Sequence, residues 1–399
     1  MDVGTPGESP DELFKTGRFE KADEGYARIL ERAPNDPRAN AQRGYIALLS
    51  NRFADAERFL MKAVDLAPAD AFSKQQLADC YVRQDQLTRA APLLRAAGLE
   101  GYARQYESVT GTPNEVHGPQ RTRIPFTTLN PGPTIEAAVN GVESGTFGLD
   151  TGAPLALTTE TAKKAGLRAV STSKGRNPQE TFTIYHGIVD SLRMGDMELR
   201  NVPAVWHNAE MPHALGVGQP EGVIGTTVFY HFLATMDFAN QALILRRKTA
   251  AQRQAFRVEA KRAGAERLPL WLADTHMPHT LGSVNGYGPG LVGLDTGVEG
   301  AIQVGTDEQT AELAGVRLDY GRPVTFAGAD ETYPFVAPVV SLGRAVSRNA
   351  YGVAVRRSGL DDRLGFETIG NFSQEFFKAL AATFDYVEMD LYITGGGQQ

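Results

Sequence analysis

The sequence contains a single cysteine, Cys80, which excludes an internal disulfide framework. We expect this thiol to be a small buried apolar residue. No stretch of the 399 residues approaches the apolar length that a membrane-spanning helix needs. Basic residues are not in excess, because 40 Lys and Arg stand against 47 Asp and Glu, for a net charge of -7. This balance argues against nucleic acid and anionic membrane surfaces as partners.

The first residues, MDVGTPGESPDELF, lack the charged and apolar regions of a secretory signal. The compartment stays open, because many exported bacterial proteins also lack disulfides. A periplasmic or secreted location would require that an upstream signal had been removed.

The first hundred residues repeat with a period of 34. The segment GRFEKADEGYARILERAPND, from Gly17, aligns with NRFADAERFLMKAVDLAPAD, from Asn51. A fainter third copy places Leu87 and Leu94 at the corresponding positions. The period, with its small, aromatic and proline positions, resembles the tetratricopeptide repeat. The pattern predicts paired helices over residues 1–100, with Pro92 bending or shortening one of them.

The front edge of this array is irregular. Its first helix should lie between Val3 and Thr16, where three helix breakers leave room for only a short helix. The array looks cut at its start, as if a longer precursor had lost its beginning. Stacked repeats offer a concave surface that binds peptides or proteins, so we expect a protein partner here. A spacer or an oligomer contact is the alternative.

After a linker over residues 101–120, short β-type runs separated by glycine and proline predict an all-β region. Within it, GLDTGAPLAL at Gly148–Leu157 returns as GLDTGVEGAI at Gly293–Ile302. A VNG triplet begins 11 residues before each aspartate, and VIG and TIG each end 75 residues after one. The segments SLRMGDMELRNV and FLATMDF are likewise echoed by VSLGRAVSRN and LAATFDY. The chain therefore contains two copies of one β-unit, each with one Asp-Thr-Gly.

These marks resemble the pepsin-like and retropepsin-like aspartic proteases, in which an apolar strand runs into Asp-Thr-Gly and a later apolar pair plus glycine crosses behind it. The resemblance covers Arg121 to about Ile393, and the short lobes look like bacterial relatives of the retropepsin fold. It implies a multidomain α and β protein: an α-helical tetratricopeptide array followed by an all-β, two-lobed acid protease. Lobe 1 would span residues 121–250 and lobe 2 residues 251–399.

In such an enzyme Asp150 and Asp295 would share one proton and activate one water for peptide hydrolysis. The pair titrates as a unit, so the sequence does not assign the proton. The resemblance also implies that Thr151 and Thr296 hydrogen-bond across the lobes. The remaining loop residues would support the turns: Gly152, Ala153, Gly297 and Val298. Because both aspartates lie in one chain, catalysis should take place within a monomer, without a cofactor.

One residue departs from the family pattern. Ala153 fits it, whereas Val298 stands where Ser, Thr or Ala is usual. A hydroxyl is thereby absent near Asp295, which could shift its pKa or weaken the activity without abolishing the site.

A β-hairpin flap covers the substrate in this family. Spacing places its tip near SKGRNPQ, and the candidate residues are Ser173, Lys174, Gly175, Arg176 and Asn177. The corresponding turn of lobe 2 is FAGADET, Phe326–Thr332. Tyr185 and Tyr333 fall on the returning strands, where they would contact substrate or act as ordinary sheet aromatics.

Other motifs point to no further chemistry. HMPH, at His276–His279, is expected to be a solvated loop and not a metal site, because no cysteine or carboxylate cluster accompanies it. GYGPG, at Gly286–Gly290, lacks the context of a phosphate loop and predicts a hairpin connection. No Gly-x-Ser-x-Gly supports a serine hydrolase. The main alternative to a protease is a non-catalytic protein of this fold that binds peptides and uses the repeats as a scaffold.

Overall fold

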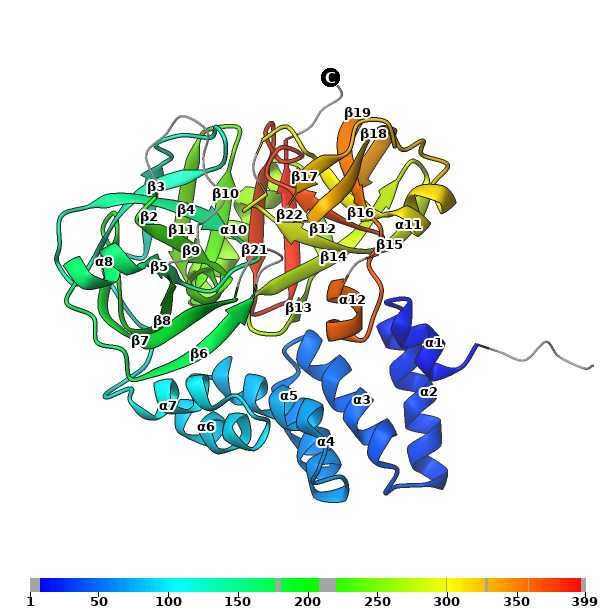
Figure 1. The fold of residues 1–399 in the computed structure, drawn as a ribbon, viewed down its shortest axis with the longest axis horizontal. Coiled ribbons are helices and arrows are strands. Elements are labelled where there is room, and N and C mark those ends of the chain that lie inside the picture. Colours follow the sequence, from blue (N-terminus) through cyan, green and yellow to red (C-terminus); the bar gives the residue numbers. More distant parts are fainter. Residues whose placement is uncertain are drawn as a thin grey trace, which may run out of the picture.

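The computed structural model describes residues 8–176, 181–207, 220–298, 300–326, 329–357 and 359–395. A helical array comes first in the chain and lies below two β-rich lobes in Figure 1. The fold class predicted from the sequence is confirmed: an α-helical repeat array is followed by an all-β, protease-like fold of two lobes.

The helices of the array begin at intervals set by the sequence repeat. One series starts 34 residues apart and consists of α2 (Phe19–Arg32), α4 (Phe53–Leu66) and α6 (Leu87–Ala96). The helices between them, α3 (Pro37–Leu49) and α5 (Ala71–Val82), are spaced in the same way. Asp36 and Asp70 cap α3 and α5 by accepting hydrogen bonds from backbone amides of the first turn. Pro92 lies inside α6, which has 10 residues where α2 and α4 have 14, so the expected shortening is found.

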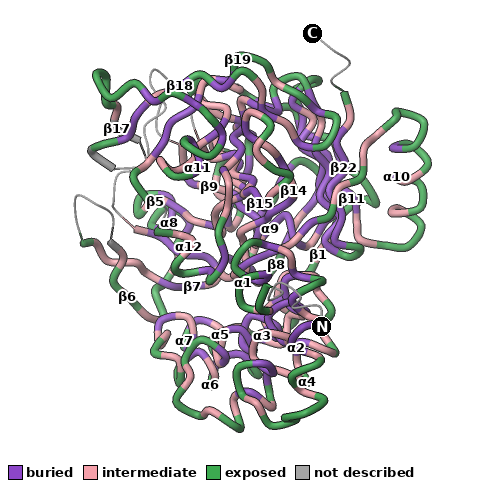
Figure 2. The backbone as a smooth tube through the Cα atoms, turned by 90° about the vertical axis from the view of Figure 1, so that its right-hand side faces the viewer, coloured by how far each residue is buried: buried purple, intermediate pink, exposed green. Residues whose placement is uncertain are grey.

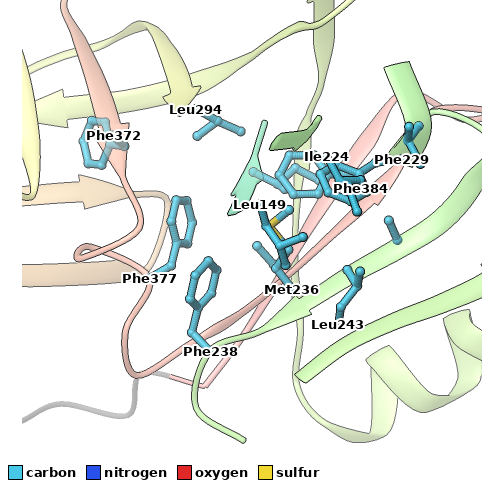
Figure 3. Close-up of a cluster of buried hydrophobic side chains, with 14 of the residues drawn as sticks. Leu149, Ile224, Phe229, Met236, Phe238, Leu243, Leu294, Phe372, Phe377 and Phe384 are labelled. Carbon is cyan, nitrogen blue, oxygen red and sulfur yellow. The ribbon is translucent and has the colours of Figure 1, made fainter. Parts of the chain in front are cut away.

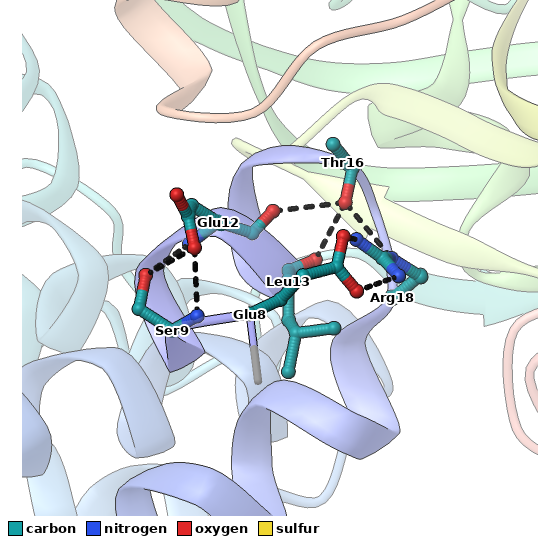
Figure 4. Close-up of polar contacts among 6 residues, drawn as sticks. All are labelled: Glu8, Ser9, Glu12, Leu13, Thr16 and Arg18. Carbon is teal, nitrogen blue, oxygen red and sulfur yellow. Dashed lines mark hydrogen bonds and ion pairs between the residues drawn. The ribbon is translucent and has the colours of Figure 1, made fainter. Parts of the chain in front are cut away.

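The first helix, α1 (Pro10–Lys15), is as short as its prolines predict. It is held by a capping box: the Ser9 amide donates to the Glu12 carboxylate at 2.7 Å, and the Glu12 amide donates to the Ser9 hydroxyl at 3.2 Å (Figure 4). Thr16 ends the helix by donating its hydroxyl to the Glu12 carbonyl at 2.8 Å. These local hydrogen bonds stabilise a helix of only six residues.

The segment expected to be a linker is partly structured. α7 (Glu100–Glu107) closes the array, and β1 (Glu115–His117) already pairs with a strand of the first lobe.

Lobe 1 is built on an eight-stranded sheet with the order β1-β8-β5-β9-β4-β3-β7-β6. After β1, its strands in chain order are β3 (Thr134–Val139), β4 (Gly145–Asp150), β5 (Ala156–Thr158), β6 (Ser171–Arg176), β7 (Thr181–Met194), β8 (Met197–His207) and β9 (Gly222–Gly225). Two short helices, α8 (Thr159–Lys164) and α9 (Thr226–Phe229), follow β5 and β9.

Lobe 2 repeats this plan with the order β13-β14-β15-β20-β16-β19-β18-β17. Its strands are β13 (Trp271–Ala273), β14 (Met277–Val284), β15 (Tyr287–Asp295), β16 (Val304–Asp307), β17 (Val324–Phe326), β18 (Ala329–Leu342), β19 (Ala345–Val355) and β20 (Gly370–Ser373). The helices α11 (Glu308–Leu313) and α12 (Gly359–Leu364) follow β16 and β19.

A third, six-stranded sheet joins the lobes, with the order β12-β22-β21-β10-β11-β2. Lobe 1 supplies β2 (Arg121–Pro125), β10 (Phe232–Asp237) and β11 (Ala242–Arg247), and lobe 2 supplies β12 (Glu266–Pro269), β21 (Ala381–Asp385) and β22 (Asp390–Thr394). The lobes meet where β10 pairs antiparallel with β21. Helix α10 (Ala250–Arg262) covers this sheet, with Phe256 against Tyr392, and lies beside β11 and β22 in Figure 2.

One hydrophobic core runs through both lobes. Leu149 and Leu294, the residues before the two aspartates, belong to it and lie near Ile224 and Phe372 (Figure 3). Leu149 and Leu294 are each 1% exposed, so the residue before each Asp-Thr-Gly lies in the core. Burial of this apolar surface fixes where the two loops leave the core.

The array is docked on both lobes. On lobe 2, Phe14 and Phe19 pack with Trp271 and Phe366 in one buried cluster. The buried guanidinium of Arg83, at the end of α5, donates to the carbonyls of Leu272, at 2.7 Å, and Asp274.

On lobe 1, α7 makes the contact. The buried amide of Gln105 donates to the carbonyls of Gly187 and Ala204 at 2.8 and 2.7 Å, and the Ser171 hydroxyl donates to the Gly101 carbonyl at 2.6 Å. The face of the array formed by α1, α3, α5 and α7 therefore rests on the lobes.

Candidate active site

The two Asp-Thr-Gly loops face each other at the junction of the lobes. Asp150 is the last residue of β4 and Asp295 the last residue of β15. Each carboxylate accepts a hydrogen bond from the glycine amide two residues later, at 2.7 Å from Gly152 and 3.0 Å from Gly297. The sequence repeat thus produces two identical local turns.

The loops approach so closely that a side chain at Gly297 would collide with the opposite carboxylate. A Cβ atom there would lie 2.3 Å from Cγ of Asp150. Glycine is therefore required at this position by space, and the contact shows that the carboxyl of one lobe lies against the loop of the other.

The two carboxyl groups lie close together: a Cβ atom at Gly152 would lie 3.1 Å from Cγ of Asp295 and 3.3 Å from Oδ1 of Asp150. Burial, followed by the charge of Asp295, raises the pKa of Asp150 well above its ordinary value of 3.8. Two carboxyl groups held so close together do not both ionise readily, because their negative charges repel each other. The pair therefore keeps one proton over a range of pH in which separate aspartates would both be ionised.

The two threonines exchange hydrogen bonds across the lobes. The Thr151 amide donates to the Thr296 hydroxyl at 3.1 Å, and the Thr296 amide donates to the Thr151 hydroxyl at 3.1 Å. The hydroxyls in turn donate to the carbonyls of Leu294 and Leu149 at 2.8 and 2.9 Å. Both threonines are buried, so these bonds fix the spacing of the two aspartates.

The pairing of the strand behind each aspartate shows that one alignment made from the sequence is wrong. β4 pairs in parallel with β9 so that Asp150 lies opposite Gly225, the last residue of VIG. β15 pairs with β20 so that Asp295 lies opposite Ser373. The structural counterpart of VIG in lobe 2 is therefore the segment 371–373, and the TIG match ending at Gly370 is wrong by three residues.

The reason for the shift is a loop length. The chain between Asp295 and β16 is three residues longer than the chain between Asp150 and β5. The sequence comparison assumed that each aspartate is followed by its crossing strand after the same number of residues. That number differs between the two lobes.

The corrected register reveals a residue that the sequence argument missed. The Asn371 side chain donates a hydrogen bond from Nδ2 to Oδ2 of Asp295 at 3.3 Å. The signal available in the sequence was a polar residue directly after the TIG triplet, and the wrong alignment hid it. Val298 and Ala153, in the turns themselves, carry no hydroxyl.

The candidate flap residues lie on a β-hairpin. Ser173, Lys174, Gly175 and Arg176 belong to β6, which pairs antiparallel with the start of β7. Asn177 lies outside the described residues. In lobe 2, β17 and β18 form the corresponding hairpin. The role of either hairpin as a cover for substrate stays a prediction.

The two tyrosines of the returning strands have aromatic neighbours. Tyr185 stacks on Trp206 with ring centroids 6.0 Å apart, and Tyr333 contacts Tyr320 at 4.6 Å.

The HMPH segment is not the solvated loop that the sequence suggested. Met277 begins β14, and His279 is 2% exposed with its ring against Phe366. Burial lowers the pKa of His279 to about 4, so this ring is neutral near pH 7. The GYGPG segment lies in the β14–β15 hairpin, as expected.

Across the described part of the chain there is no group of three or more His, Cys, Asp or Glu side chains that could hold a metal ion. Within the same residues, no helix is long and apolar enough to cross a membrane.

The comparisons with known proteins agree with this site. The family model described as aspartyl protease matches residues 135–228, which run from β3 to α9 of lobe 1 and include Asp150. These residues are thus similar to an aspartyl protease domain. The match covers lobe 1 alone, and the second Asp-Thr-Gly, in lobe 2, lies outside it.

No curated protein matches this chain. The solved structures that match include a mutant of the O-GlcNAc transferase of Thermobaculum terrenum. That match has 22% identity, covers 26% of this chain and 22% of the other, and has a TM-score of 0.24. A likeness of this size implies nothing about the function of this chain.

Proposed function

We propose that the chain is an aspartic endopeptidase of the retropepsin-like type, in which Asp150 and Asp295 activate one water for peptide-bond hydrolysis. The observation that carries the proposal is the close approach of the two carboxyl groups, one from each lobe, across loops that face each other, with the pKa of Asp150 raised by burial and by the charge of Asp295. One carboxylate can then accept a proton from water while the other acid donates to the scissile carbonyl. Both groups come from one chain, so the proposed unit of catalysis is the monomer.

The proposed substrate is a peptide or protein that lies across the junction of the lobes beneath the β6–β7 and β17–β18 hairpins. We consider the repeats to be tetratricopeptide repeats on the strength of their 34-residue period. Their proposed protein partner would bind away from α1, α3, α5 and α7, because those helices contact the lobes.

The test is cleavage of a diverse peptide mixture between about pH 3 and pH 7, read by mass spectrometry, a range over which a carboxyl pair that shares a proton can work. Asp150→Asn and Asp295→Asn should each abolish the cuts. Asp196→Asn, an exposed aspartate in the turn between β7 and β8, is the control and should leave them unchanged.

If the folded wild type cuts nothing and all variants bind the same peptides, the chain is a peptide-binding protein of this fold and the proposal fails.

A further inference from the structure

Asn371 lies in the strand directly behind the second aspartate. Its Nδ2 donates to Oδ2 of Asp295 at 3.3 Å, while the amide of Gly297 donates to Oδ1 of the same carboxylate at 3.0 Å. Both oxygens of Asp295 thus have a donor.

The position of the Asn371 amide is built into the sheet. Asn371 pairs with Gly293 of β15, and a Cβ atom at Gly293 would lie 2.5 Å from Oδ1 of Asn371. The amide therefore occupies the space that a side chain at Gly293 would take. Glycine at this position lets Asn371 reach the carboxylate.

Lobe 1 has a valine at the corresponding place. Val223 pairs with Gly148 of β4 as Asn371 pairs with Gly293, and each is the single partly buried residue of an otherwise buried strand. Valine has no donor to offer. Among the described residues, the donors to the Asp150 carboxyl are the amides of Gly152 and Gly297. The pair thus has a side-chain amide on one side only.

The turns themselves do not remove this asymmetry. Ala153 and Val298, which follow the two Asp-Thr-Gly segments, have no hydroxyl to donate. The amide of Asn371 supplies to Asp295 the kind of hydrogen bond that a hydroxyl at position 298 would supply.

We propose that Asn371 is a positioning residue of the carboxyl pair: its amide orients Asp295 and favours the ionised form of Asp295, so that the shared proton resides on Asp150. This inference rests on the proposed function. The physical reason is that a hydrogen bond donated to a carboxylate stabilises its charged form. The raised pKa of Asp150, caused by burial and by the charge of Asp295, agrees with this assignment.

The assignment fixes the direction of the proton transfers. The Asp295 carboxylate accepts a proton from the water, whose oxygen bonds to the scissile carbonyl carbon as the carbonyl π bond breaks. The carbonyl oxygen takes the proton of Asp150. One proton enters the pair and one leaves it.

The test exchanges the residues between the lobes. Asn371→Val reproduces lobe 1 and removes the donor, so the pair should ionise at a higher pH. We expect the acid limb of the kcat/KM profile to move up by about one pH unit, a tenfold change in the ionisation equilibrium, with kcat reduced more than KM is raised.

Adding Val223→Asn restores a donor beside the pair and should bring the limb back down. Asn371→Leu is the second variant, since its side chain matches asparagine more closely in length. An acid limb that stays at its wild-type pH in both folded variants would overturn the proposal.

A titration that does not depend on activity separates this inference from the proposed function. Carbon-13 NMR of protein labelled at the aspartate carboxyl carbons, with Asp295→Asn as reference, follows the pair directly. Asn371→Val should raise the lower titration step of the pair, and an unchanged step contradicts the role of Asn371. The NMR test of Asn371 applies whether or not the wild type cuts any peptide. Absence of cuts, by contrast, contradicts the proposed function and not the role of Asn371.

Discussion

The hydroxyl of Thr151 accepts a hydrogen bond from the amide of Thr296 at 3.1 Å, and the same bond is made in the opposite direction at 3.1 Å. Two residues 145 positions apart in the chain are thereby tied into one buried network. The network makes the distance between the catalytic candidates a property of both lobes together.

Thr151→Val should destabilise the protein and reduce peptide cleavage. The change leaves the Thr296 amide and the Leu294 carbonyl buried without partners, which should cost about 2–4 kcal/mol of unfolding free energy. Urea unfolding measures the cost. Thr280→Val is the matched control, because that buried hydroxyl makes one bond, to the Pro269 carbonyl, within lobe 2. Equal losses in the two variants would show that the bonds between the lobes have no special weight.

Asp79, in α5, should make the protein less stable as the pH rises. Burial raises the pKa of this carboxyl from 3.8 to about 8. Above about pH 4 the unfolded chain ionises it while the folded chain keeps it protonated, so the free energy of unfolding falls from there to about pH 8. Asp79→Asn stays neutral and should be more stable than the wild type by about 4 kcal/mol at pH 7 and equal to it near pH 3. Urea midpoints at both pH values test this. A difference of the same size at both would contradict the assignment.

Arg83 should couple the array to lobe 2. Arg83→Met leaves the carbonyls of Leu48, Leu272 and Asp274 without their buried donor, at a cost of at least about 3 kcal/mol. Circular dichroism reports mainly on the helices, while both tryptophans of the chain, Trp206 and Trp271, lie in the lobes.

We expect coincident urea transitions by the two signals in the wild type and separate transitions in Arg83→Met. Arg89→Met removes an exposed arginine of the neighbouring helix α6 and should leave the transitions coincident. Coincident curves in Arg83→Met as well would mean that the apolar contacts alone hold the array.

Gln105 should restrain the lobe 1 hairpin. Gln105→Leu removes both donors to the carbonyls of Gly187 and Ala204, and hydrogen exchange in β6 and the first half of β7 should become faster by at least tenfold, since each lost bond to a buried carbonyl costs about 1 kcal/mol or more. Gln84→Leu is the control, because its amide bonds to Cys80 within the array. Unchanged exchange in the hairpin would show that α7 is a passive neighbour.

The parts of the fold that were predicted correctly are those that local sequence specifies. The 34-residue period fixes where α2 and α4 begin, because Phe19 and Phe53 start helices that bury the same face. The doubled Asp-Thr-Gly indicated two equivalent turns for a similar reason, since the glycine amide bonds to the aspartate two residues earlier. Neither conclusion needs long-range information.

The errors came from features that depend on pairing between distant strands. A three-residue difference in one loop moved the crossing strand of lobe 2, so that Asn371 and not Thr368 lies opposite Gly293. The HMPH segment was expected to be solvated because a proline separates its histidines and no cysteine or carboxylate cluster accompanies it, but strand pairing buries His279 against Phe366.

The sequence by itself determined the helical repeats, the two β-units and the identity of the paired aspartates, because periodicity and turn chemistry act over a few residues. Only the tertiary structure decided the strand register behind Asp295, the contact of Asn371 with its carboxylate and the docking of the array on both lobes. These depend on which surfaces are buried together and on the exact lengths of loops, and packing of a whole chain sets both.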